Sequence, residues 1–370
     1  MKTFKRNVPE GAVPLVSVEG TAYECGRAYG EIVLEKYSGY MRYLRLVPLW
    51  NSKRRFVTAL FEQKAPQVLD IYSGMQAAMN GLGCRKSFQG VGRDSMSRRS
   101  YVYRPDKVVR PCHLKFNSSD ECTSFSIHPA LTLDNSPISG QNKDTPHASA
   151  LKYIVLRMRI RNAPSILVLA YPGEVLGYGL WTTGMTIFRN SLYSGENTRG
   201  KLTMFEWGLL ALAGKSVEEA RELAEKYGIR ESGNCLISDI QGNSISVEFN
   251  KGGSCFIPPQ KGINTHANHP VGKKTAPYED YPDRIEKDNS RYRMNFLWKL
   301  LNAERGRLTA QRALMCLADH SRYPRGICRH MVGKSVGMGT TAAVVAEPAR
   351  GRLHVVRGNP CCNPAVIYEL

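Results

Sequence analysis

The sequence contains no long hydrophobic run, since no stretch approaches the roughly 18 apolar residues that a membrane-spanning helix needs. Its basic first residues are not followed by the apolar segment of a secretory signal peptide. We therefore expect a cytoplasmic protein without a membrane partner. No internal repeat is visible, and 370 residues are enough to bury a substantial core in one or two domains.

Cysteine pairs at the spacing of a metal or redox motif are also missing. The ten cysteines are scattered along the chain, with no Cys-x-x-Cys pair and no Cys/His spacing typical of zinc. This distribution argues against a disulfide scaffold and predicts reduced thiols and no metal site. Adjacent Cys361 and Cys362 are a weak redox or metal signal, and two thiols near the C-terminus are the simpler interpretation.

Acidic residues are scarce relative to basic ones, 32 against 51, which gives a formal net charge of +19. A basic surface suits anionic partners such as nucleic acid, anionic lipid or a CoA thioester. The chain has no zinc finger, RNP motif or basic zipper, so nucleic acid is an unfavoured partner. The basic stretch 85–110 fits a solvated loop.

Strands and helices alternate along the chain. Residues 12–80 are expected to be mostly helical, and the Gly-, Ser- and Arg-rich residues 82–121 to form a loop or linker. From residue 122 the order is strands, two helices, strands, two helices, strands. This order predicts an α+β fold with two stacked sheets between helical layers. The expected helices after residue 122 cover 203–213, 217–227, 282–302 and 308–320.

One predicted hairpin contains a candidate nucleophile. Thr123–Ile127 and Pro137–Gln141 are short β-prone runs separated by turn-forming residues. A hairpin would bring Cys122, at the start of the first strand, close to Asp144, just past the second. A thiol beside a carboxylate is compatible with nucleophilic catalysis, but spacing alone favours an inert buried cysteine.

Motifs in this region resemble a known family. Cys-Thr-Ser at 122–124 followed by Gly-Gln-Asn-Lys-Asp at 140–144 resembles the acyl-coenzyme A:6-aminopenicillanate acyltransferase family, peptidase family C45, of the N-terminal-nucleophile (Ntn) hydrolases. Segments 264–270 and 323–329 also resemble this family. The resemblance implies a four-layer αββα sandwich, preceded here by a mostly helical N-terminal segment.

The resemblance also implies a mechanism. The precursor, a zymogen, would cut the Glu121–Cys122 bond by itself, so that 1–121 and 122–370 form a heterodimer of the chain's own two fragments. Cys122 would then supply the thiol and also an α-amine, whose ordinary pKa of about 7.7–8.0 suits a base. Asp144 would orient the amine or assist processing, and Asn268 would donate to the oxyanion. No cofactor is implied, although acyl-CoA is a possible co-substrate.

Four further residues are predicted to contact the substrate. Asn190 would position the substrate or the amine, and Gln141 stands where related acylases have arginine. Trp181 replaces a family asparagine, and its ring should reshape the pocket. Arg329 would bind a substrate carboxylate or hold a buried acid such as Asp144.

Two other departures concern processing and specificity. Glu121 stands where the penicillin-forming relatives have glycine before the cut, which restricts backbone strain at that bond. Val336 replaces an arginine of those relatives. Together with Trp181, it predicts little penicillin synthesis.

We therefore predict an autoproteolytic N-terminal-cysteine amidohydrolase or acyltransferase that acts on a small N-acyl amine or an acyl-CoA through a thioester. Two alternatives remain open at this point. One is a papain-like thiol hydrolase that uses Cys122 with His266 or His330. The other is an inactive Ntn scaffold that binds polyanions.

Overall fold

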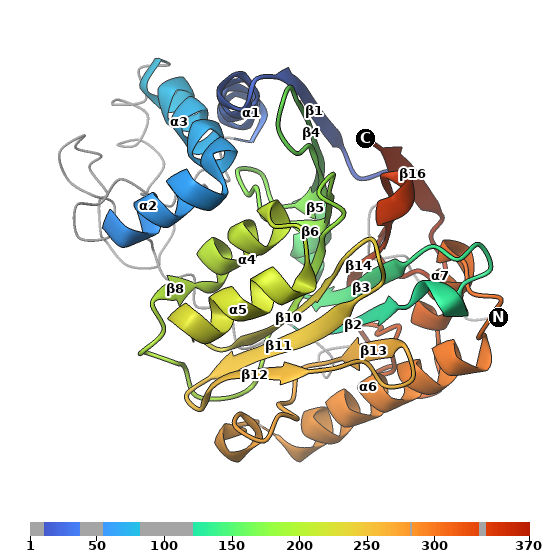
Figure 1. The fold of residues 1–370 in the computed structure, drawn as a ribbon. Coiled ribbons are helices and arrows are strands. Elements are labelled where there is room, and N and C mark those ends of the chain that lie inside the picture. Colours follow the sequence, from blue (N-terminus) through green and yellow to red (C-terminus); the bar gives the residue numbers. More distant parts are fainter. Residues whose placement is uncertain (1–10, 38–54, 82–120, 282, 333–337) are drawn as a thin grey trace, which may run out of the picture.

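The computed structural model describes residues 11–37, 55–81, 121–281, 283–332 and 338–370. Two large sheets lie face to face (Figure 1). In spatial order the eight-stranded sheet contains β1 (Leu15–Gly20), β4 (Ile154–Ile160), β5 (Ile166–Ala170), β6 (Tyr178–Trp181), β7 (Thr186–Asn190), β10 (Gly233–Ser238), β11 (Ser244–Asn250) and β12 (Gly253–Ile257). The six-stranded sheet contains β13 (Ile263–His266), β2 (Glu121–Ile127), β3 (Ile138–Thr145), β14 (Gly339–Glu347), β15 (Arg352–Arg357) and β16 (Ala365–Glu369).

Helices cover the outer face of each sheet. The eight-stranded sheet carries α1 (Ala22–Lys36), α2 (Arg55–Lys64), α3 (Pro66–Gly81), α4 (Met204–Ala213) and α5 (Val217–Tyr227). The six-stranded sheet carries α6 (Arg284–Ala303) and α7 (Ala310–Leu317). A short pair, β8 (Leu202–Thr203) and β9 (Ile229–Arg230), flanks the α4–α5 hairpin. The predicted αββα sandwich is confirmed.

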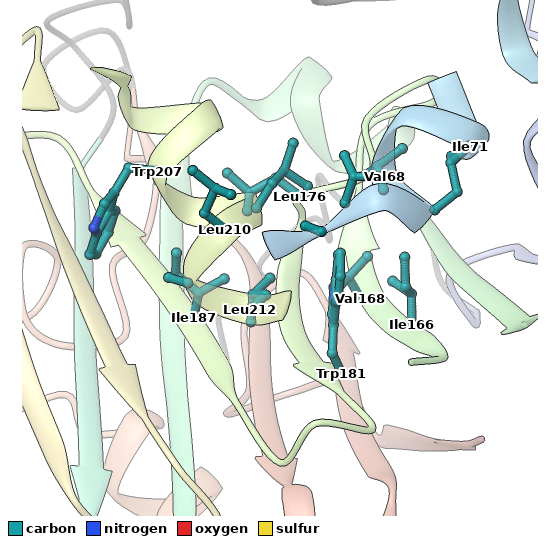
Figure 2. Close-up of a cluster of buried hydrophobic side chains, with 14 of the residues drawn as sticks. Val68, Ile71, Ile166, Val168, Leu176, Trp181, Ile187, Trp207, Leu210 and Leu212 are labelled. Atoms are coloured by element: carbon teal, nitrogen blue, oxygen red, sulfur yellow. The ribbon is translucent and has the colours of Figure 1, made fainter. Parts of the chain in front are cut away.

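Alternating side chains of the central strands supply two separate cores. In β5, Ile166 and Val168 pack toward the helices, whereas Leu167 and Leu169 pack between the sheets. This follows from the two-residue period of a strand, and it explains why β5 is apolar throughout. Figure 2 shows the helix-side core, in which Val68 and Ile71 of α3 approach the sheet.

The N-terminal segment is mostly helical, as predicted, but it also contributes a strand. β1 pairs in parallel with β4, so this segment and the rest of the chain share one sheet. A capping box between Thr21 and Glu24 begins α1. A Cβ built on Gly26 would lie 2.0 Å from the Ile71 carbonyl oxygen, so α1 and α3 pack too closely there for any residue but glycine. The loop expected over 82–121 lies, except for Glu121, outside the described residues.

The two hairpin strands and the four helices predicted after residue 122 are present, with bounds within a few residues of those expected. β6, β8, β9, β13 and β16 were not predicted. Within the described ranges, none of the helices combines the length and the apolar character needed to span a bilayer.

Candidate active site

The β2–β3 hairpin places Cys122 opposite Lys143 and Glu121 opposite Asp144. Because side chains alternate along a strand, Cys122 and Lys143 face the eight-stranded sheet, whereas Glu121 and Asp144 face the helical layer. Cys122 is only 2% exposed. The hairpin therefore brings Cys122 and Asp144 to the same strand ends, as predicted, but on opposite faces of the sheet.

Asn268 lies directly beside the backbone of Cys122. The Cys122 N–H donates to Asn268 Oδ1 over 3.0 Å, and Arg293 Nη2 donates to the same oxygen over 3.0 Å. Asn268 Nδ2 donates to the Ser191 carbonyl over 2.8 Å. Two donors on one side of the amide and an acceptor on the other establish which atom is oxygen. In this structure Asn268 therefore offers its carbonyl oxygen to the Cys122 N–H, and its NH2 group donates to Ser191.

Arg293, on α6, organises the start of β2 and was not identified from the sequence. Its Nη1 donates to the Cys122 carbonyl over 2.7 Å and to Thr123 Oγ1 over 2.6 Å. Its Nη2 pairs with Glu121 Oε2 at 2.6 Å. Both charged side chains are fully buried. Arg293 thus holds the two residues that flank the predicted cleavage bond.

Arg329 completes the ion cluster. Its Nη1 pairs with Glu121 at 2.7 Å and its Nη2 with Glu286 at 2.6 Å. Asp144 accepts from Thr340 Oγ1 over 2.7 Å and lies 4.0 Å from Arg293. In this structure, Arg329 holds a buried acid, one of the two roles anticipated for it.

Burial disfavours the ionised forms of the two carboxyl groups, Glu121 and Asp144. Burial raises the pKa of Glu121 to about 7, although Arg293 and Arg329 oppose the shift. Burial likewise raises the pKa of Asp144, against the same two arginines. The two guanidinium groups therefore offset only part of the cost of burying these acids side by side.

Lys143 faces the space between the sheets, on the same side as Cys122. Its Nζ donates to Tyr178 Oη over 2.7 Å and lies 4.1 Å from the ring centroid. Burial alone lowers the pKa of Lys143, but the acidic groups of Tyr178 and Cys122 raise it well above its ordinary value. The ammonium group is therefore retained. In the sequence, the feature that could have identified Lys143 is its position inside the 140–144 motif.

Asn190 and Gln141 also lie between the sheets. Asn190 Nδ2 donates to Ser124 Oγ over 2.9 Å, and Gln141 Nε2 donates to the Arg189 carbonyl over 2.8 Å. Both side chains are buried. Within the described part of the chain, Asn190 Oδ1 and Gln141 Oε1 have no hydrogen-bond partner. Both acceptor oxygens belong to side chains that lie between the two sheets, the space that the Cys122 side chain also faces.

Trp181 does not belong to this group. Its side chain is fully buried in the helix-side core of Figure 2, next to Val168. That core lies on the outer face of the eight-stranded sheet, whereas Cys122 faces the inner one. The predicted contact of Trp181 with substrate is therefore withdrawn. Val336, the other specificity position, lies outside the described residues.

The histidines proposed for a papain-like pair have other partners. His266 Nε2 bonds Glu248 at 2.7 Å, and its Nδ1 lies 2.8 Å from the Ala267 carbonyl. His330 Nε2 lies 2.9 Å from His320 Nε2. Both ring nitrogens of His266 are thus engaged, and His330 belongs to a different cluster. Neither histidine is therefore placed to act as the base of a Cys–His pair with Cys122.

Comparison with known proteins agrees with the fold. The family model "Acyl-coenzyme A:6-aminopenicillanic acid acyl-transferase" matches residues 132–361, more than half of the chain, and its match begins ten residues after Cys122. No curated protein matches the sequence.

Two solved structures show a remote likeness. A mutant of the conjugated bile acid hydrolase from Clostridium perfringens is 13% identical, with 67% of this chain and 97% of that chain covered and a TM-score of 0.44. Penicillin V acylase from Agrobacterium tumefaciens is 12% identical, with 68% and 78% covered and a TM-score of 0.34. From the family match and the αββα architecture we conclude that this chain belongs to the acyl-coenzyme A:6-aminopenicillanic acid acyl-transferase family and is an Ntn-type amide hydrolase or acyltransferase.

Proposed function

We propose that this protein is a self-cleaving N-terminal-cysteine enzyme that transfers an acyl group from a small N-acyl amine or an acyl-CoA to water or to an amine. The observation that carries the proposal is the 3.0 Å hydrogen bond from the Cys122 N–H to Asn268 Oδ1. Cleavage before Cys122 would convert this N–H into an α-amine that is already held beside the thiol.

Self-cleavage would begin with attack of the Cys122 thiol on the Glu121 carbonyl. The peptide C–N bond breaks, a thioester forms, and the former amide nitrogen takes the thiol proton. Water then hydrolyses the thioester, which leaves a Glu121 carboxylate and a free N-terminal Cys122. Arg293 supports this step because it holds the Glu121 side chain and the Cys122 carbonyl on either side of the reacting bond.

In the catalytic cycle the α-amine takes the thiol proton, and the thiolate attacks the substrate carbonyl. The amine or CoA departs with a proton from the ammonium, and an acyl thioester remains on Cys122. Water or a second amine then accepts the acyl group. Lys143 stabilises the thiolate as a neighbouring cation, since its cross-strand position lies on the same face. Asn190 and Gln141 offer acceptor oxygens to an amide N–H of the substrate.

The thioester can be tested directly. The purified protein is incubated with a panel of N-acyl amines and acyl-CoA thioesters, and the reaction is stopped in acid, because a protonated α-amine cannot remove the acyl group. We expect an acyl mass on the Cys122 peptide that neutral hydroxylamine removes. Turnover of a substrate with no such adduct under rapid quenching would contradict the proposal.

Two substitutions at Asn268 separate its possible roles. If its carbonyl orients the α-amine, Asn268→Asp keeps an acceptor and should retain kcat/KM within about tenfold, whereas Asn268→Ala should lose about 10²-fold through misplacement of the base. If its NH2 group stabilises the oxyanion, kcat/KM should fall by about 10²–10³-fold in both variants, and the loss should be larger in Asn268→Asp. Turnover per cleaved chain, together with the melting temperature of each variant, decides between these outcomes.

Replacing Lys143 by methionine should raise the pH needed to form the thiolate. We expect kcat/KM of Lys143→Met to fall by about 10–100-fold near neutral pH, with a smaller loss at high pH, because a nearby cation favours the thiolate by about one pKa unit or more. The pH profile of Cys122 alkylation measures this effect. Lys226→Met is the matched control, since Lys226 also lies over a tyrosine ring but is exposed. An unchanged alkylation profile in Lys143→Met would rule out the electrostatic role.

A further inference from the structure

Four metal-ligating side chains meet at a site separate from the residues around Cys122. They are His320, Cys328, His330 and Cys361, whose nitrogen and sulfur atoms all lie within 4.8 Å of one another. His330 Nε2 is 2.9 Å from His320 Nε2, 3.6 Å from Cys328 Sγ and 3.4 Å from Cys361 Sγ. The group joins the loop that follows α7 to the turn that precedes β16.

These separations match those of a tetrahedral ion site. With Zn–N bonds of about 2.0–2.1 Å and Zn–S bonds of about 2.3 Å, the ligand atoms of a tetrahedron stand about 3.3–3.8 Å apart. The two nitrogen–sulfur distances, 3.4 and 3.6 Å, lie within this range, and the nitrogen–nitrogen distance of 2.9 Å is shorter, so small side-chain movements would be enough to close the site. Two thiolates with two imidazoles in a tetrahedral arrangement form a ligand set that is typical of zinc.

The backbone of the first loop is already ordered in the arrangement that this set requires. The Cys328 N–H donates to the Asp319 carbonyl over 3.0 Å, and the His330 N–H donates to the Pro324 carbonyl over 2.8 Å. Asn359, from the second segment, donates to Cys328 Sγ over 3.4 Å. An N–H directed at a ligating sulfur is the kind of outer hydrogen bond that orients metal ligands.

We propose that His320, Cys328, His330 and Cys361 bind one zinc ion that fixes the loop carrying Arg329. In the sequence, Arg329 stands between two of the ligands, Cys328 and His330. Asn359 Nδ2 also donates to the Arg329 carbonyl over 2.7 Å. The Arg329 side chain reaches the opposite way, to Glu121. A metal at this position would therefore hold the arginine that supports the start of β2. Residue spacing could not predict the site, because Cys361 is 31 residues from His330 and is joined to it only by the fold.

The probe is Co²⁺, added to purified, metal-stripped protein with reduced thiols. We expect one equivalent to give the intense visible bands of tetrahedral cobalt, together with sulfur-to-cobalt charge transfer in the near ultraviolet, and Zn²⁺ to displace both. His320→Ala, at an exposed ligand, should reduce affinity by at least tenfold, and Cys361→Ser should remove part of the charge transfer. Cys362→Ser, at the neighbouring thiol outside the group, should leave the spectrum and affinity unchanged.

A disulfide between Cys328 and Cys361 is the competing use of this group. In protein purified in air without reductant, it would appear as a mass two hydrogens lower than the reduced chain and as the loss of two titratable thiols, and protein purified with reductant would contain no stoichiometric zinc. That result would overturn the proposal, as would weak octahedral cobalt spectra, or cobalt spectra that are the same in His320→Ala and wild type. None of these readouts depends on enzymatic activity, so failure of the zinc site and failure of the proposed function remain distinguishable.

Discussion

Cys122→Ala should remain a single chain of 370 residues with no measurable turnover, whereas the wild type should separate into 1–121 and 122–370 under denaturing conditions. Alanine cannot attack the Glu121 carbonyl and cannot form an acyl-enzyme, so one substitution removes both processing and catalysis. Intact mass in denaturant and N-terminal sequencing measure the first effect. Turnover of any substrate that the wild type accepts measures the second.

Cys255→Ala is the matched control, because Cys255 is a half-buried thiol on β12 of the other sheet. It should be cut and active like the wild type. Full activity in protein whose sole N-terminus is Met1 would contradict self-cleavage before Cys122. That result would instead favour a thiol hydrolase that does not need a free N-terminal cysteine.

Arg293→Met should be the most destabilising substitution near the site. It removes the hydrogen bonds to Glu121, to the Cys122 carbonyl and to Asn268, and leaves a fully buried carboxylate with Arg329 as its remaining ion-pair partner among the described residues. Removing one partner of a buried ion pair typically costs about 3–5 kcal/mol. Urea unfolding should be measured in the Cys122→Ala background, since a single uncut chain keeps the transition interpretable.

A second substitution tests whether Glu121 causes that cost. Adding Glu121→Gln to Arg293→Met removes the stranded charge, so a substantial part of the lost stability should return, and a double-mutant cycle gives the coupling energy. Arg291→Met, at a half-exposed position two residues away, should change stability by less than about 1 kcal/mol. A loss of less than about 1 kcal/mol in Arg293→Met would show that the cluster does not depend on this arginine.

Some features of this protein were determined by the sequence alone, because they depend on neighbours along the chain. The capping box at Thr21–Glu24 needs four consecutive residues, and the β2–β3 hairpin needs two β-prone runs and a turn. The unpredicted strands show the limit of such reasoning. Residues 263–266 are largely polar, and they form β13 through pairing with β2 rather than through local preference.

The tertiary structure alone decided how the site is assembled. A hairpin predicts that Cys122 and Asp144 approach one another, but the register places the thiol with Lys143 and the carboxylate with Glu121. Arg293 reaches Glu121 across 172 positions of the chain, a contact that no local pattern specifies. For the same reason, the sequence predicted neither the cluster that includes His330 nor the position of Trp181 in the core. The partners of a side chain on other elements depend on packing and register, which are properties of the folded chain.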